Sequence, residues 1–169
     1  MKRSFVVAAL TVTVAAAAFL GGRALRPAPT DEEQIRTLFA DAARAAEEKR
    51  IGDAVRDVSE RFEGEGLDRR GVKQLVAAHV LRGTWVSVAI AGAAIAPGAD
   101  AARAAVDVVL SRSGKGTPLT ELLPAQASVH RFQLRLERER GAWKVVGAAW
   151  RPITIEEAVA GPELPTDSP

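Results

Sequence analysis

The chain has 169 residues, and its composition excludes several classes of protein. The absence of cysteine rules out disulfides, thiolate zinc sites, thiol catalysis and a cysteine-linked lipid anchor. Four of the 23 Lys and Arg residues flank an N-terminal apolar segment, which leaves 19 basic against 21 acidic residues, a net charge of −2. We therefore expect no nucleic-acid partner, because such binding needs a basic surface.

An uncharged apolar segment covers residues 4–20 and follows Lys2 and Arg3. With the two glycines that come next it is just long enough to span a bilayer, which takes about 20 residues. The small-x-small pattern at residues 16–18 lies inside the apolar run, where it makes a poor cleavage site. An uncleaved signal anchor is the preferred interpretation, and a cleaved signal peptide with a secreted product is the alternative. Both export the domain, so we expect membrane contact through residues 4–22 and a periplasmic or other extracytoplasmic location.

Three helices are predicted after this segment. Thr30 and Glu33 form a capping box, and apolar residues at helical spacing continue the first helix to about Arg50. A short second helix comes next, followed by an extended piece around Phe62. A third helix begins after Asp68, whose side chain is suited to an N-cap.

Strands are predicted in the second half of the chain. Residues 84–95 alternate with Val88 and Ile90 on one face and Trp85 on the other, and residues 103–111 form the next strand. Residues 127–153 then predict a long antiparallel hairpin that turns at residues 138–141. The predicted organisation is an anchor (or signal peptide) and linker at 1–29, an α+β domain at 30–155, and a disordered tail at 156–169.

This order of elements resembles the nuclear transport factor 2-like superfamily, which includes ketosteroid isomerase and the small polyketide cyclases. The likeness rests on the order and on the segments 52–62 and 143–151. It implies an α+β fold in which a cone-shaped, curved antiparallel sheet of about four main strands wraps around three N-terminal helices, here preceded by an N-terminal apolar helix. It also implies an apolar pocket at the open end of the cone. Some members are enzymes and others only bind or assemble, so the fold alone does not decide the function.

The chain has no tyrosine, so it lacks the aspartate–tyrosine site of the ketosteroid isomerase type. The two histidines, His79 and His130, lie on apolar faces of the third helix and the third strand. If the cone fold points both faces inward, the two imidazoles could act as an acid–base pair. The competing interpretation is two core histidines, each bonded to a backbone carbonyl.

Other candidates are weighed against ordinary packing. Trp85, Trp150 and Phe132 are candidate ligand-binding residues, and Arg151 is a candidate contact for an anionic ligand. The alternatives are core packing for the aromatic residues and a surface ion pair for Arg151. For Trp150 we expect packing against the first helix. Asp107 interrupts an apolar strand and is expected to face solvent or a partner.

The sequence has no metal-ligand spacing, phosphate loop or catalytic triad pattern, so we expect no metal and no cofactor. The preferred hypothesis is a membrane-tethered, non-enzymatic domain that binds a small apolar ligand or a protein partner. A small lyase, isomerase or cyclase that uses His79 and His130 is the first alternative. The second is a structural component of an envelope complex that forms a homodimer through the outer sheet face, because Val145 and Val146 make the last strand apolar on both faces.

Overall fold

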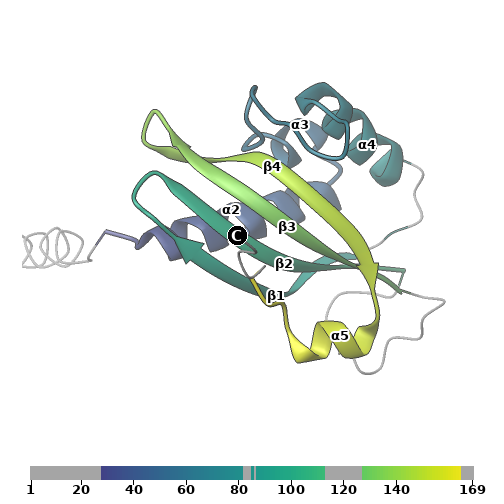
Figure 1. The fold of residues 1–169 in the computed structure, drawn as a ribbon. Helices are drawn as coiled ribbons and strands as arrows, with labels where there is room; N and C mark the ends of the chain where they lie inside the picture. Colours follow the sequence, from purple (N-terminus) through teal and green to yellow (C-terminus); the bar gives the residue numbers. More distant parts are fainter. Residues whose placement is uncertain (1–27, 82–84, 86, 113–126, 165–169) are drawn as a thin grey trace, which may run out of the picture. The chain divides into compact units, whose positions relative to one another are not determined.

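An antiparallel sheet with strands in sequential order organises the domain, and a computed structural model describes residues 28–81, 85, 87–112 and 127–164 (Figure 1). The domain lies within one compact unit, Asp31–Pro169. Its elements are α2 (Asp31–Glu47), α3 (Ile51–Ala54), α4 (Arg69–Leu81), β1 (Ser87–Pro97), β2 (Ala101–Ser111), β3 (Ala127–Glu139), β4 (Ala142–Ile153) and α5 (Ile155–Ala160). The α+β architecture with a curved four-stranded sheet and helices is confirmed for these residues.

The predicted N-terminal apolar helix and the linker up to residue 27 lie outside the described residues, as does the loop 113–126. Among the helices that are described, none has the length and hydropathy needed to cross a bilayer.

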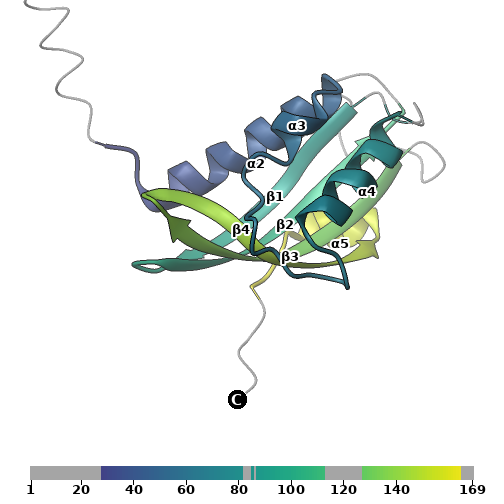
Figure 2. The same ribbon diagram turned by 90° about the horizontal axis from the view of Figure 1, so that it is seen from above.

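The helix that packs most deeply on the sheet is α2. Ile35 and Phe39 are four residues apart, so both point to one side of the helix, where they are 0% and 7% exposed. They join a core that includes Val106, Leu136 and Trp143 from three strands. Figure 2 shows α2 and α4 along the same side of the sheet. At the start of α4, Gly71 N donates to Asp68 Oδ1 at 2.7 Å, which is the predicted N-cap.

Two bulges set which side chains face the helices. Ile90 pairs with Val108 and Gly92 pairs with Asp107, so β1 contains one extra residue between them. Ile90 and Ile95 consequently pack on the same core although Ile95 comes an odd number of positions after Ile90 in the sequence. A second bulge lies between Arg135 and Leu136 in the pairing of β3 with β4.

The second bulge explains the adjacent valines of β4. Val145 pairs with Leu136, Val146 is the extra residue, and both valines are 8% exposed. The segment 57–63 pairs with this edge: Val145 N donates to Asp57 O at 2.8 Å and Glu63 N donates to Val146 O at 3.1 Å. The apolar stretch is therefore covered within the chain, as the expectation that both faces meet something other than water requires, and the homodimer stays a prediction.

A short helix, α5, packs on the other face of the sheet and is drawn below the strands in Figure 1. Thr154 and Glu157 form a capping box: Glu157 N donates to Thr154 Oγ1 at 3.2 Å, and Thr154 N donates to Glu157 Oε2 at 2.9 Å. Ala158 packs against Val109 and Val129. The predicted disordered tail from residue 156 is thus corrected for residues 156–160, and residues 165–169 lie outside the described part.

Candidate functional site

A cavity of about 450 Å³ lies between the sheet and the helices α2 and α4. This volume falls in the range of about 300–1,000 Å³ that is usual for small-molecule pockets. Most of its wall is apolar. The wall residues from the helices and strands are Leu38, Phe39, Ala42, Ala43, Ala46, Glu47, Ala54, Val72, Leu75, Val76, His79, Val80, Val88, Ile90, Val106, Val108, Leu110, His130, Phe132, Leu134, Val145, Ala148 and Trp150.

The wall follows from the periodicity of its elements. Every apolar residue of the α4 stripe that the spacing predicts, together with His79, lies in the wall. The alternate residues Val106, Val108 and Leu110 of β2 lie there too. No described side chain of α4 is fully buried, and Leu75 is 36% exposed. This helix therefore mainly lines a space, and Val72 is its contact with the packed core.

Both histidines line this cavity. His79 is exposed, and its Nδ1 lies 2.9 Å from Leu75 O, so Nδ1 carries the proton because a carbonyl only accepts. His130 is half-buried, and its Nε2 lies 2.7 Å from Ser128 Oγ. Burial, followed by the charge of His79, lowers the pKa of His130. The competing interpretation was two core histidines, each bonded to a backbone carbonyl. Of the two, His79 contacts a backbone carbonyl but is exposed, whereas His130 contacts a serine hydroxyl.

Three aromatic candidates, Trp85, Phe132 and Trp150, lie in the wall of the cavity. Phe132 and Trp150 pair across β3 and β4, with ring centroids 6.1 Å apart. Trp150 is half-buried and lines the cavity, where Leu38 and Phe39 of the first helix lie as well.

The prediction that Trp85 lies on the strand face opposite Val88 and Ile90 is wrong. Trp85 precedes the first residue of β1, Ser87, so the alternation of a strand does not apply to it. It lines the cavity together with Val88 and Ile90, and the guanidinium of Arg112 lies 5.6 Å from its ring centroid.

The carboxylates in the wall are engaged by the protein. Glu47 accepts from Ser87 Oγ at 3.2 Å and from Val88 N at 3.0 Å, which ties the end of α2 to the start of β1. Asp57 accepts from Lys144 Nζ at 2.7 Å. Within the described ranges, no three His, Asp or Glu side chains are grouped so that they could hold a metal ion.

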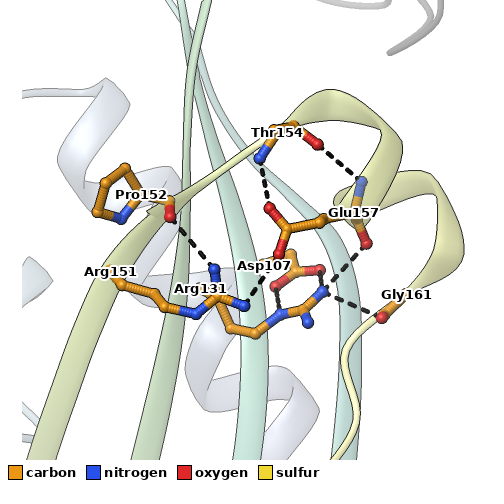
Figure 3. Close-up of polar contacts among 7 residues, drawn as sticks. All are labelled: Asp107, Arg131, Arg151, Pro152, Thr154, Glu157 and Gly161. Atoms are coloured by element: carbon orange, nitrogen blue, oxygen red, sulfur yellow. Dashed lines mark hydrogen bonds and ion pairs between the residues drawn. The ribbon is translucent and has the colours of Figure 1, made fainter.

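Arg151 does not line the cavity. Its guanidinium lies 3.0 Å from Glu157 Oε1, and the two side chains are 57% and 40% exposed. This is the surface ion pair that the sequence offered as the alternative. Figure 3 shows the pair beside α5, and α5 packs on the face opposite to the cavity.

The expected exposure of Asp107 is also wrong. Asp107 is 0% exposed and accepts two hydrogen bonds from Arg131, from Nε at 2.7 Å and from Nη2 at 2.8 Å (Figure 3). The same Nη2 donates to Glu157 O at 3.1 Å and Gly161 O at 3.0 Å. The carboxylate raises the pKa of Arg131. Asp107 therefore anchors α5 and is remote from any role as a base in the cavity.

Sequence reasoning missed Ser128, the partner of His130. The signal was available, since two residues separated by one position lie on the same face of a strand.

Comparison of the chain with family models gives no match, and comparison with curated proteins gives none either. Solved structures with the same arrangement do exist. One is a nuclear transport factor 2-like protein of unknown function from Pseudomonas putida, with a TM-score of 0.54 and 14% identity over 69% of this chain and 82% of that one. Another is a protein of unknown function with a cystatin-like fold from Nostoc punctiforme, with a TM-score of 0.56 and 10% identity over 73% of this chain and 93% of that one. At these identities the likeness concerns the fold.

Proposed function

We propose that this domain, which has the nuclear transport factor 2-like fold that its sequence resembles, is a non-enzymatic binding domain whose cavity takes a small apolar ligand. The observation that supports this most directly is the incomplete burial of the apolar face of α4. Its apolar stripe borders a cavity, and none of its described side chains is fully buried. An apolar helix face gains stability only when something removes it from water, and a ligand in the cavity would do so.

The proposal is tested by titrating the full chain, kept in amphipol, with the neutral apolar dye N-phenyl-1-naphthylamine. Amphipol alone is the blank. Ala43→Phe fills the cavity from α2 and is expected to reduce dye binding by about tenfold or more, a loss of about 1.4 kcal/mol. Ala40→Phe adds the same ring at an exposed position of the same helix and should bind like the parent. Equal dye binding by the two variants would contradict the proposal.

We also propose that the domain is tethered to a membrane by residues 4–22, outside the cytoplasm. The support is the length and lack of charge of that segment. After expression in a bacterium, the full chain should sediment with membranes and stay there after an alkaline carbonate wash. Its intact mass distinguishes the anchor from the alternative, because cleavage would remove the apolar segment.

A second candidate function is acid–base catalysis by His79 and His130. The observation in its favour is that both imidazoles line one cavity and have different environments. An apolar ketone such as 2-octanone would be incubated with the protein in D₂O, and deuterium uptake beside the carbonyl would be followed by NMR. Exchange that is lost in both His79→Gln and His130→Gln would support catalysis and contradict the non-enzymatic proposal.

Homodimerisation through the outer sheet face stays a prediction, as does binding of a protein partner. The helix α5 packs over Val109 and Val129 on that face. A dimer would have to use the rest of the face or displace this helix. Sedimentation equilibrium at increasing protein concentration tests this, and a monomer throughout would count against the dimer.

A further inference from the structure

Each of the two cavity histidines has one ring nitrogen occupied by its own chain. Leu75 O accepts from Nδ1 of His79, and Ser128 Oγ contacts Nε2 of His130. These contacts fix the ring orientations and leave Nε2 of His79 and Nδ1 of His130 for a ligand. The two rings come from different walls of the cavity, α4 and β3, and after burial the charge of His79 is the second cause that lowers the pKa of His130.

The cavity gives these imidazoles no carboxylate partner within the described residues. Glu47 is engaged at the start of β1, and Asp57 is paired with Lys144. The remaining charged group of the wall is Lys49, which is exposed. A protonated His130, which is half-buried, would therefore gain a counter-charge from a ligand, because burying an unpaired charge is costly.

We propose that the ligand of this cavity is an amphiphile with a carboxylate head, held by His79 and His130, whose apolar body lies along Phe132, Trp150 and the aliphatic wall. This inference rests on the proposed binding function and adds the chemical class of the ligand. An apolar wall that carries a small number of polar groups is the usual design of a site that orients such a molecule, and His79 and His130 are polar groups of this wall.

Binding of a carboxylate is coupled to proton uptake. In the empty cavity, burial and the charge of His79 disfavour a proton on His130. A carboxylate between the rings reverses this preference because it favours the charged imidazole. Affinity for the carboxylate therefore rises as the pH falls through the range in which the histidines titrate. Lys49, Glu47 and Asp57 also face the cavity, and both carboxylates are already engaged: Glu47 by the backbone N of Val88 and Asp57 by Lys144.

The test compares octanoate with 1-octanol, which share an apolar chain and differ in the head group. Both are titrated into the full chain in amphipol by calorimetry, with amphipol alone as the blank. Octanoate stays ionised at about pH 6 and at about pH 8, because an unperturbed carboxyl titrates at about 4.3. We expect octanoate to bind about tenfold more tightly at the lower pH, with proton uptake seen as a heat that depends on the buffer, and octanol to bind equally at both.

Variants distinguish this inference from the binding function itself. His79 is exposed, so His79→Gln should fold and should weaken the binding of octanoate much more than that of octanol. If octanoate and octanol bind alike at both pH values, and Ala43→Phe abolishes both, the inference fails and the binding function stands. If Ala43→Phe changes neither, the binding function fails, and the inference fails with it.

Discussion

Asp107 and Arg131 form a buried ion pair with two parallel hydrogen bonds, of 2.7 and 2.8 Å, and Asp107 is 0% exposed. Such paired geometry gives the strongest hydrogen bonds available to these groups. Arg131 also holds two backbone carbonyls at the end of α5. The pair therefore fixes the helix that covers the outer face of the sheet.

Removal of one partner should be costly. Asp107→Ala leaves the Arg131 guanidinium, itself 12% exposed, without its counter-charge, and we expect a loss of about 3–5 kcal/mol in the free energy of unfolding. Urea titration followed by circular dichroism measures it. Arg151→Ala breaks the exposed ion pair between Arg151 of β4 and Glu157 of α5. This change should cost about 0–1 kcal/mol in the free energy of unfolding. Equal losses in the two variants would show that burial of the Asp107 pair is not what stabilises the domain.

Gly64 and Gly52 differ in how closely other atoms approach the position that a side chain would occupy. At Gly64, an added methyl group would overlap Ala148 O and lie 2.9 Å from Phe62 Cζ. Gly64→Ala should therefore destabilise the domain by about 1–3 kcal/mol. At Gly52 in α3 a methyl group meets nothing within 4 Å, so Gly52→Ala should be neutral or add up to about 1 kcal/mol. Thermal unfolding compares them, and an unchanged midpoint for Gly64→Ala would refute the close approach of this segment to β4.

Trp150 and Trp143 lie on the same strand in different environments. Trp143 is 4% exposed, its Nε1 donates to Asp31 Oδ1 at 3.4 Å, and the Arg138 guanidinium lies 4.5 Å from its ring. We expect Trp143→Ala to cost about 3–5 kcal/mol. Trp150 is half-buried and borders the cavity, so Trp150→Ala should cost clearly less and should weaken binding of the apolar dye instead.

Chemical denaturation of both variants, with dye titration of Trp150→Ala, settles this point. A loss for Trp150→Ala as large as for Trp143→Ala would mean that Trp150 is part of the packed core, as its position opposite the first helix predicts from sequence.

His130 should make stability depend on pH. Its pKa in the folded state is lowered, mainly by burial, so below about pH 6.5 the unfolded chain binds a proton that the folded chain resists. Stability should consequently fall as the pH drops from about 6.5 towards the folded-state pKa of His130. His130→Gln removes this dependence, while the contribution of the carboxylates is common to both proteins. Urea unfolding from about pH 7.5 to about pH 5 measures the difference, and parallel curves for the two proteins would contradict the lowered pKa.

The local patterns of the sequence were sufficient for most elements of the fold. Alternation in Phe132, Leu134 and Leu136 predicted β3, and the spacing of Ile35 and Phe39 predicted α2, because a strand and a helix each repeat their faces at a fixed period. The order of these elements predicted the cone fold, and that fold brings His79 and His130 to one cavity. The candidate site was predictable to that extent.

The tertiary structure decided what covers each face. The pattern correctly placed Asp107 opposite Val106, but its burial depends on α5, which comes much later in the chain. The bulge at Val146 and the position of Trp85 before β1 likewise could not be predicted from the two-residue alternation of a strand. Both depend on pairing with other segments of the chain. Sequence periodicity determines the direction of a side chain relative to its own element. Whether that direction leads to solvent, to a cavity or to an ion pair depends on contacts between residues far apart in the chain, and only packing fixes those.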